Sequence, residues 1–314
     1  MMRLGIVVPC YNEEEVLPET IARLAALVRG LIEKGKIAPE SGVYYVDDGS
    51  RDATWKIIQD AAAREAGVHG IKLSRNRGHQ NALLAGLEGA QGDAIISVDA
   101  DLQDDLGVIE KMVDLYVGGA EIVYGVRESR TTDTIFKRIT AEFYYRLLAR
   151  MGVQIVFNHA DYRLMSRRAL QALERFGEVN LFLRGIIPQL GFTTATVTYA
   201  RGERFAGESK YPLRKMLALA ANGITSFSVV PLRLIAGLGL LISSFSALMI
   251  GWIVVGKLFN DVIPGWASSV VPIYLLGGVQ LLSIGIIGEY IGKIYLETKR
   301  RPRFLIEERT ESKD

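Results

Sequence analysis

The sequence contains a single cysteine, Cys10, among its 314 residues. One thiol excludes both an internal disulfide framework and a zinc site built on cysteines. Histidine is also scarce: the chain has three, and their scatter gives no metal-ligand spacing. We therefore expect Cys10 to pack in an apolar strand, and His79 and His159 to be polar scaffold residues.

Two common nucleotide-binding signatures are missing from the sequence. The chain has neither the GxGxxG fingerprint nor the GxxxxGK(S/T) loop, which argues against a dinucleotide oxidoreductase and a P-loop ATPase. The formal net charge is only +2 at pH 7, so the composition gives no sign of a general nucleic-acid binder. We expect no nucleic-acid partner.

Hydrophobic residues are abundant, at 49% of the chain with a mean hydropathy of +0.19. Residues 234–256 and 262–288 carry no charge, and each stretch is long enough to cross the hydrocarbon core of a bilayer. The alternative is a buried helix pair in a soluble core, which such long uncharged stretches disfavour. We predict two transmembrane helices, at about 234–256 and 264–288.

Basic residues flank this predicted hairpin on both sides. They are Arg201, Arg204, Lys210, Arg214, Lys215 and Arg233 before it, and Lys293, Lys299, Arg300, Arg301 and Arg303 after it. By the positive-inside tendency both flanks face the cytoplasm. The N-terminus shows no signal peptide. We expect an integral protein of the bacterial inner (plasma) membrane, with its large N-terminal domain and both termini in the cytoplasm.

The N-terminal part alternates between apolar strand patterns and helical patterns. Strands are predicted at 4–9, 42–46, 68–73 and 93–98, and helices at 14–34, 53–65 and 80–89. Such alternation is typical of an α/β fold with a mostly parallel sheet. The predicted organisation is a domain at 1–200, a juxtamembrane segment at 201–231, the two membrane helices within 232–292, and a basic tail at 293–314.

Polar clusters follow three of these strands, at 9–13, 47–50 and 99–103. Ligands of such sheets bind beyond the carboxyl ends of the strands. While the chain stays extended, Asp99 and Asp101 point the same way, and Gln103 adds a third oxygen nearby. Oxygen ligands suit Mg²⁺ or Mn²⁺ bound to a diphosphate. The alternatives are a solvated acidic loop, and helix caps or turn residues for Asn12 and Asp48.

Six segments in order resemble glycosyltransferase family 2, in its polyisoprenyl-phosphate glycosyltransferase branch. They are residues 7–13 (VVPCYNE), 46–50 (VDDGS), 76–80 (NRGHQ), 99–103 (DADLQ), 161–165 (DYRLM) and 204–211 (RFAGESKY). The resemblance covers nearly the whole chain and implies a GT-A, Rossmann-like fold that binds a nucleotide sugar. One departure is Ala160, which stands where the family usually has glycine before the later aspartate.

The resemblance also implies roles for individual residues. Nucleotide-sugar binding falls to Pro9, Tyr11, Asn12, Glu13, Asp48 and Asp99; metal binding to Asp99, Asp101 and Gln103; and catalysis to Asp101 and Asp161. Asp161 would orient the acceptor or the sugar, or accept a residual proton. A homo-oligomer, a tetramer, is the assembly that the resemblance favours.

The acceptor is argued from charge and amphipathicity. Residues 135–151 carry apolar side chains at every fourth position with basic side chains alongside, which favours an interfacial helix, and residues 213–227 are a second candidate. Ordinary core packing is the alternative for both. A lipid phosphate needs cationic receptors, and the candidates are Arg127, Arg130, Arg201, Arg204 and Lys210.

The sequence thus predicts a membrane-bound inverting transferase that moves a hexose, glucose from UDP-glucose, to undecaprenyl phosphate on the cytoplasmic leaflet. Mannose, N-acetylglucosamine or amino-arabinose are alternative sugars for the same lipid. A processive polysaccharide synthase is disfavoured, because none of Trp55, Trp252 and Trp266 follows an arginine as its Gln-x-x-Arg-Trp motif requires. An alternative of another class is a catalytically silent nucleotide-sugar sensor or membrane scaffold.

Overall fold

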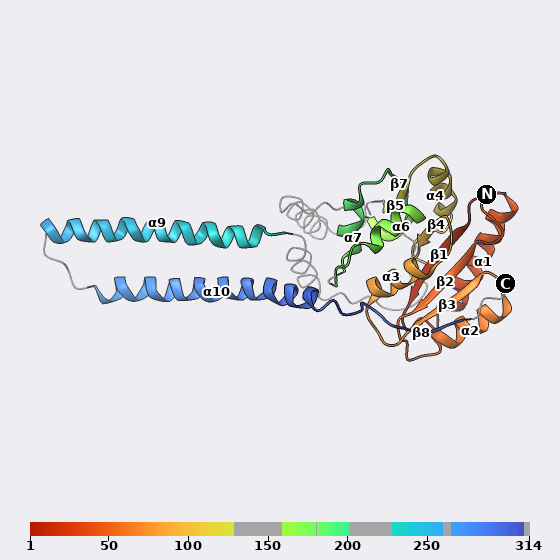
Figure 1. Ribbon diagram of the computed structural model, residues 1–314, viewed down its shortest axis with the longest axis horizontal. Helices are drawn as coiled ribbons and strands as arrows, with labels where there is room; N and C mark the ends of the chain where they lie inside the picture. The colour runs from red at the N-terminus through yellow and green to blue at the C-terminus, as the bar shows by residue number, and fades with distance from the viewer. Residues whose placement is uncertain (129–158, 180, 201–227, 260–264, 311–314) are drawn as a thin grey trace. The chain divides into compact units, whose positions relative to one another are not determined.

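The computed structural model describes residues 1–128, 159–179, 181–200, 228–259 and 265–310 (Figure 1). The chain divides into two compact units. The first contains the described residues up to 200 together with those from Arg300 onward, and the second contains the described residues from 228 to Lys299. The predicted interfacial helices at 135–151 and 213–227 lie outside the described residues.

The first unit is built on a sheet whose described part has eight strands in the order β7-β5-β6-β4-β1-β2-β3-β8. The strands are β1 (Leu4–Cys10), β2 (Gly42–Asp47), β3 (Val68–Leu73), β4 (Ala94–Ser97), β5 (Ile122–Arg127), β6 (His159–Ser166), β7 (Thr194–Tyr199) and β8 (Ile306–Arg309). The first four agree with the predicted strands to within a residue or two. The α/β prediction is confirmed.

Six of the eight described strands run in one direction, as a mostly parallel sheet requires, and β6 and β8 run against them. Strands β1 to β4 pair in parallel, and so do β5 and β7. Strand β6 lies antiparallel between β4 and β5. Strand β8 pairs antiparallel with β3 and is the last strand of the sheet on that side. Because β1, β2 and β4 run in the same direction, their carboxyl ends lie along the same side of the sheet, and the predicted site is located there.

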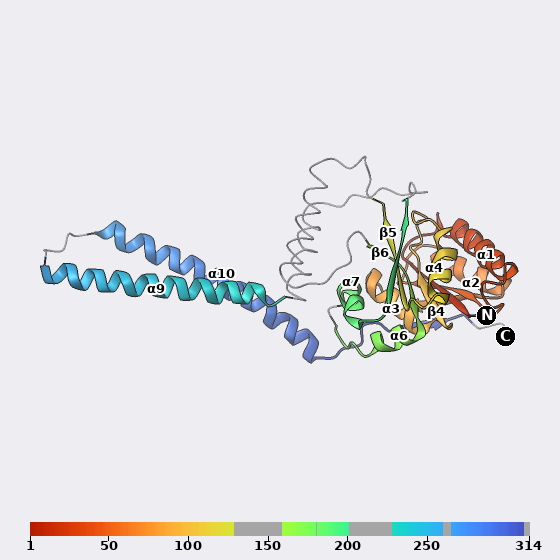
Figure 2. The ribbon, with the colours of Figure 1, turned by 90° about the horizontal axis from the view of Figure 1, so that it is seen from above.

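Helices cover both faces of the sheet (Figure 2). They are α1 (Leu17–Glu33), α2 (Thr54–Arg64), α3 (His79–Gly89), α4 (Val108–Val117), α6 (Arg167–Glu174) and α7 (Leu183–Ile186), with a 3-10 turn η1 at Ile187–Leu190. Helices α1 and α4 pack on the face that carries Leu4, Ile6 and Val8, because their buried apolar residues recur at helical spacing.

Helix α3 packs on the other face, unusually close to the strands. A methyl group added at Gly86 would lie 2.3 Å from Val7 Cγ1 and 2.8 Å from Val46 Cγ2. Only a residue without a side chain allows this approach. The close packing holds α3, which begins at His79, against the strands that carry the predicted site.

The C-terminal tail contributes a strand that the sequence analysis does not predict. Within the predicted basic tail at 293–314, β8 extends the sheet beyond β3. Its Glu308 accepts hydrogen bonds from Trp55 Nε1 at 3.1 Å and Gln59 Nε2 at 2.8 Å, both on α2. Residues 307–309 are all charged, so the sequence has no alternation of apolar and polar residues that would predict a strand here. Charged side chains are common on edge strands.

The second unit contains two long helices at the predicted membrane segments, α9 (Val230–Phe259) and α10 (Trp266–Thr298). Among the described residues, one stretch is long and apolar enough to cross a membrane, Leu275–Thr298, and Val230–Ile242 is a shorter apolar helix. Large apolar side chains such as Leu240 and Leu281 are more than 70% exposed. Two helices are therefore present where predicted, and their crossing of a bilayer stays a prediction.

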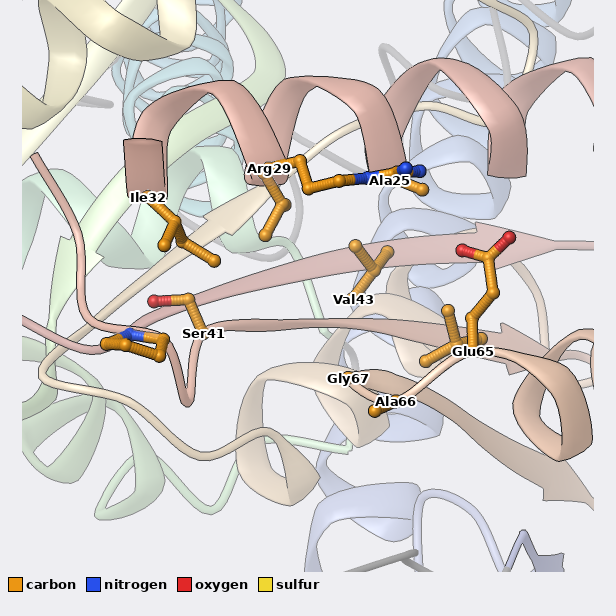
Figure 3. A pocket seen from close by; sticks show the side chains of 11 residues that line it. Ala25, Arg29, Ile32, Ser41, Val43, Glu65, Ala66 and Gly67 are labelled. Atoms are coloured by element: carbon orange, nitrogen blue, oxygen red, sulfur yellow. The ribbon is translucent and has the colours of Figure 1, made fainter. Parts of the chain in front are cut away.

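A cavity of about 380 Å³ lies at the amino end of β2, between α1 and the turn before β3 (Figure 3). Its apolar lining includes Val28, Ile32 and Val43, and Arg29 and Glu65 supply charge. This cavity is at the end of β2 opposite to Asp47 and Asp48, and none of the predicted site residues lines it.

Candidate active site

The loops after β1 and β2 are joined by hydrogen bonds between their backbones and side chains. The Asn12 N–H donates to Ser50 Oγ at 3.0 Å, and the Arg51 N–H donates to Asn12 Oδ1 at 2.9 Å. Asn12 has a φ of 54°, a conformation that asparagine tolerates better than most residues. The predicted nucleotide-sugar residue Asn12 therefore joins two loops through its side chain.

Asp48 performs a similar task between β2 and the segment that leads into α3. Its Oδ1 accepts from the Arg77 N–H at 2.7 Å, and its Oδ2 accepts from the Gly78 N–H at 2.8 Å. Gly49, at a φ of +67°, lies so close to residues 75 and 76 that a Cβ would be 2.7 Å from their backbone. The carboxylate of Asp48 thus places the start of α3.

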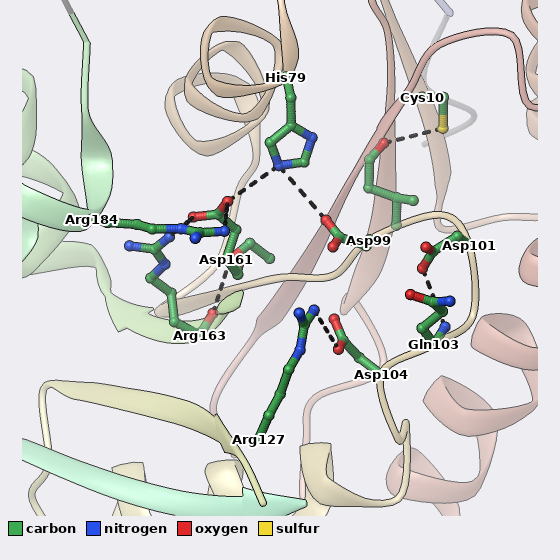
Figure 4. Close-up of polar contacts among 12 residues, drawn as sticks. Cys10, His79, Asp99, Asp101, Gln103, Asp104, Arg127, Asp161, Arg163 and Arg184 are labelled. Carbon is green, nitrogen blue, oxygen red and sulfur yellow. Dashed lines mark hydrogen bonds and ion pairs between the residues drawn. The ribbon is translucent and has the colours of Figure 1, made fainter. Parts of the chain in front are cut away.

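His79, the first residue of α3, lies between two of the predicted site carboxylates (Figure 4). Its Nε2 is 3.7 Å from Asp99 Oδ1 and 3.5 Å from Asp161 Oδ2. Burial lowers the pKa of His79, but the hydrogen bond to Asp161 and the charge of Asp99 outweigh it and raise the pKa above its usual value. The expectation that His79 is a scaffold residue is incomplete, because the side chain faces the site.

Asp161, on β6, is surrounded by positive charge. Arg163 Nη2 bonds its Oδ1, and Arg184, on α7, reaches Oδ2 through Nη2 at 3.0 Å and Oδ1 through Nε at 3.3 Å. Burial acts to raise the pKa of Asp161, but the hydrogen bond from His79 and the charges of Arg163 and Arg184 hold it well below its usual range. Asp161 is therefore a carboxylate at neutral pH and a poor proton acceptor.

Asp99 has the opposite electrostatic environment. Its side chain is 31% exposed. Burial raises its pKa to about 6; His79 opposes the rise, and the neighbouring carboxylates Asp104, Asp161 and Asp101 add to it. The surroundings thus lower the pKa of Asp161 and raise the pKa of Asp99. Opposite shifts of two carboxyl groups in one site are typical of functional sites.

The loop from Asp99 to Gln103 is a turn, because β4 ends at Ser97. The Gln103 N–H donates to Asp101 Oδ1 at 3.2 Å, and Leu102 between them has a φ of 55°. Figure 4 shows Asp101 and Gln103 on one side of the loop and Asp99 turned toward His79. Alternation along an extended strand therefore does not arrange these side chains, contrary to the basis of the prediction.

No group of three or more His, Cys, Asp and Glu side chains is arranged to hold a metal ion within the part of the chain that the structure describes. The oxygen donors of Asp99, Asp101 and Gln103 nonetheless suit a hard divalent cation. The raised pKa of Asp99, caused by burial and then in part by neighbouring carboxylates, marks a concentration of negative charge that such a cation would neutralise. The donor set therefore fits Mg²⁺ or Mn²⁺.

The remaining predicted residues have varied environments. Pro9 is buried in β1 and Tyr11 is 42% exposed in the loop that follows, where the Glu13 N–H donates to Thr54 Oγ1 at 2.9 Å. Arg127, predicted to receive the acceptor phosphate, pairs with Asp104 at 3.2 Å instead of standing in solvent. The other four predicted phosphate receptors, Arg130, Arg201, Arg204 and Lys210, lie outside the described residues.

Sequence reasoning missed several residues of the site. Arg163 lies two positions after Asp161 on the same strand, so strand alternation could have indicated that both side chains share one face. Arg184 and Tyr199 carry no local signal, because only the tertiary fold brings α7 against Asp161 and places β7 next to β5. His79 was within a recognised segment but had no metal-ligand spacing to single it out.

The chain is similar to known proteins over nearly its whole length. Residues 5–174 match the family model for glycosyl transferase family 2. An uncharacterized glycosyltransferase, YkoT of Bacillus subtilis, is 53% identical over 97% of this chain and 91% of its own length. The bactoprenol glucosyl transferase of Shigella phage SfX is 41% identical over 98% of this chain and all of its own.

Among solved structures, mannosyl-3-phosphoglycerate synthase from Rubrobacter xylanophilus is similar to this chain. The identity is 16% over 85% of this chain and 79% of that one, with a TM-score of 0.49.

Proposed function

Because the chain belongs to glycosyltransferase family 2, we propose that it is a membrane-bound inverting transferase that moves glucose from UDP-glucose to polyprenyl phosphate. The observation that carries the proposal is the cluster of Asp99, His79, Asp161 and Arg184 at the carboxyl edge of the sheet. The bactoprenol glucosyl transferases, 41% identical over almost the full chain, support the choice of sugar and lipid.

The donor binds over the loops after β1 and β2. Tyr11 offers an exposed ring, and the hydrogen bonds from Asn12 to Ser50 and from Arg77 to Asp48 fix the shape of the surface on which the base and ribose lie. Glu13 and Pro9 border the same edge. Such preorganisation lowers the entropic cost of ordering the loops when the nucleotide binds.

Asp99, Asp101 and Gln103 are the residues that would hold the divalent cation, Mg²⁺ or Mn²⁺. When bound, it neutralises charge on the leaving diphosphate. His79 contacts Asp99 and Asp161 at once, so it fixes the position of one carboxylate relative to the other. The two aspartates therefore act as one unit, even though Asp99 lies in the loop after β4 and Asp161 lies on β6.

In the reaction, an oxygen of the acceptor phosphate forms a bond to the anomeric carbon while the bond from that carbon to the diphosphate oxygen breaks. The electron pair of the broken bond leaves with the nucleoside diphosphate, and the configuration inverts. A phosphate acceptor is already ionised near neutral pH, so no strong general base is needed. The low pKa of Asp161 agrees with this, and the role that we assign to Asp161 is to hold Arg184 and His79 in place.

The acceptor is undecaprenyl phosphate in the cytoplasmic leaflet of the bacterial plasma membrane. Helix α10 supplies an apolar stretch of sufficient length, and basic residues follow it at Lys299, Arg300 and Arg301. The catalytic unit and both termini lie in the cytoplasm, and the active form is a homo-oligomer, a tetramer. Arg130, Arg201, Arg204 and Lys210 are the cations that receive the lipid phosphate.

The deciding experiment is transfer of labelled sugar from a panel of UDP- and GDP-sugars to undecaprenyl phosphate with Mg²⁺ or Mn²⁺. Purified wild type and Asp101→Ala are compared. A chloroform-soluble product formed from UDP-glucose by wild type and lost in the variant supports the proposal. A product from another sugar, such as mannose, N-acetylglucosamine or amino-arabinose, corrects the donor. No lipid product from any donor, with folded protein and added metal, refutes the acceptor and favours a nucleotide-sugar sensor.

A further inference from the structure

Asp104, which directly follows the Asp99–Gln103 loop, forms a buried polar triangle with Arg127 and Tyr199. The Asp104 side chain is 0% exposed. Its Oδ1 accepts from Tyr199 Oη–H at 2.5 Å and from Arg127 Nη2 at 3.2 Å, and Arg127 Nε donates to Tyr199 Oη at 3.2 Å. Each corner of the triangle therefore bonds both of the others (Figure 4 shows the Asp104–Arg127 side).

A second anchor holds the next residue of the same loop. Tyr162 Oη–H donates to the carbonyl oxygen of Asp105 at 3.0 Å, and the Tyr162 ring meets the Tyr199 ring edge-on, with centroids 5.3 Å apart at 86°. Tyr162 is fully buried and follows Asp161 on β6. Two consecutive loop residues are thus tied to β5, β6 and β7.

The triangle uses the charge of Arg127 within the fold. Arg127 is 28% exposed and is the last residue of β5, and its guanidinium faces a carboxylate that has no access to solvent. Burial acts to lower the pKa of Arg127, but the charge of Asp104 and the hydrogen bond with Tyr199 raise it. The guanidinium of an arginine bound in this way neutralises its partner carboxylate and is not available as the receptor of a ligand phosphate.

We propose that Asp104, Arg127 and Tyr199 form a strut that positions the Asp99–Gln103 loop for the cation and the donor diphosphate, and that Arg127 is a positioning residue rather than a receptor of the acceptor phosphate. The inference rests on the proposed function, which assigns the cation and the donor diphosphate to the Asp99–Gln103 loop. The strut acts through the backbone, because only four residues separate Asp99 from Asp104. The left-handed conformation at Leu102 leaves this short segment without a helix or strand of its own.

The test compares three variants of the full-length protein, Tyr199→Phe, Arg127→Lys and Asp104→Asn. Tyr199→Phe removes one hydroxyl and keeps the ring that packs on Tyr162, so it is the variant least able to disturb folding. Tyr116→Phe is the matched control, because Tyr116 Oη–H donates at 3.4 Å to the carbonyl oxygen of Asp93, away from the loop. Thermal midpoints measured in detergent confirm that each variant is folded.

Hydrogen–deuterium exchange of the peptide that spans residues 98–105 gives a readout that needs no substrate. The strut predicts faster exchange in Tyr199→Phe and unchanged exchange in Tyr116→Phe. It also predicts a Kd for Mn²⁺ and UDP-glucose, measured without acceptor, that rises about fivefold, as the loss of one hydrogen bond implies. The KM for undecaprenyl phosphate should stay within about twofold in Arg127→Lys.

Four results separate the possibilities. Unchanged exchange in Tyr199→Phe overturns the strut, as does faster exchange with unaltered affinity for both Mn²⁺ and UDP-glucose. A raised KM for undecaprenyl phosphate in Arg127→Lys, with donor affinity intact, overturns the assignment of Arg127 and restores it as a phosphate receptor. Faster exchange and weaker Mn²⁺ binding, in a wild type that transfers no sugar to lipid, leaves the strut standing and refutes the proposed acceptor.

Discussion

Arg184 and Asp161 form a two-point pair, in which Nη2 lies 3.0 Å from Oδ2 and Nε lies 3.3 Å from Oδ1. Asp161 is 7% exposed and Arg184 is 37% exposed, so the pair joins the interior of the site to its surface. A planar guanidinium can meet both oxygens of a carboxylate at once, whereas an ammonium group cannot. The orientation of Arg184 is therefore set by the carboxylate behind it.

Arg184→Lys tests whether that orientation is used in the reaction. The charge remains but the fork is lost, so we expect sugar transfer to fall roughly 10- to 100-fold, with a thermal midpoint close to that of wild type. The control is Arg168→Lys, since Arg168 pairs with Glu121 at 3.0 Å and is 75% exposed. Full transfer activity in Arg184→Lys would contradict the role assigned to this pair.

Asp161→Asn should also lower the stability of the fold. Arg163 is 1% exposed, and its Nε and Nη1 have no hydrogen-bond partner among the described residues, so Asp161 is its main charge partner there. Removing one member of a buried pair costs roughly 3–5 kcal/mol, because the other charge stays buried. We expect a correspondingly lower free energy of unfolding at pH 7, measured with denaturant in detergent.

The same pair predicts a pH dependence with a definite sign. The pKa of Asp161 is lower in the folded chain than in the unfolded one, so its stabilisation is present above the ordinary carboxyl pKa of about 4 and is lost as pH falls through the folded value. The difference in unfolding free energy between wild type and Asp161→Asn should therefore shrink below about pH 4. A difference that stays constant on acidification would show that charge is not its cause.

Asp99 predicts the opposite sign. Its folded pKa is raised to about 6, so its favourable contribution is full below about pH 4 and is lost as pH rises through 6. In the absence of metal, Asp99→Asn should therefore raise the thermal midpoint at pH 8 and lose that advantage at pH 4. Added Mn²⁺ should stabilise the wild type more than the variant, and equal stabilisation of both would argue against Asp99 as a ligand.

The elements up to residue 100 could be predicted because each carries its own periodic signal. The Leu17, Ile21, Leu24, Val28 and Leu31 stripe of α1 is one example, and the apolar run of β4 is another. Strand β8 could not be predicted, because its four residues are all exposed and three of them are charged. An edge strand is stabilised by backbone pairing, which leaves no mark in composition.

The carboxylates of the site could also be located, because they follow recognisable strands. Their partners could not. Arg184 comes from a helix of four residues, and Tyr199 comes from a strand that reaches the site only through the order β7-β5-β6-β4. The expectation for Arg127 was based on charge alone, which cannot show that a buried Asp104 already faces it. Residue type predicts chemistry, but sheet order decides which groups meet.

Gly86 tests the close contact that fixes α3. Gly86→Ala would place a methyl group 2.3 Å from Val7 Cγ1, so we expect a loss of about 1–3 kcal/mol in the free energy of unfolding. Gly30→Ala is the matched control, because Gly30 is also helical and has no atom within 4 Å of the added Cβ. That control should be stabilised by about 0.5–1 kcal/mol. Equal effects of the two substitutions would contradict the packing described for α3.

The C-terminal strand offers a comparison between two neighbouring glutamates. Glu308 accepts hydrogen bonds from Trp55 and Gln59, whereas Glu307, 49% exposed, has an ion pair with Lys72 at 3.4 Å. Glu308→Ala removes both acceptors and leaves the indole N–H without its partner, so we expect a loss of about 1–3 kcal/mol. Glu307→Ala removes an exposed pair and should cost under about 1 kcal/mol.

Indole fluorescence provides a local readout for the same comparison, although the chain has three tryptophans. Replacing Trp252 and Trp266 by phenylalanine leaves Trp55 as the sole emitter, and its emission should shift to longer wavelength in Glu308→Ala, because the detached strand exposes the ring to water. The spectrum should be unchanged in Glu307→Ala. If neither substitution moves the emission or the unfolding free energy, β8 is not held by these side chains and depends on its backbone pairing with β3 alone.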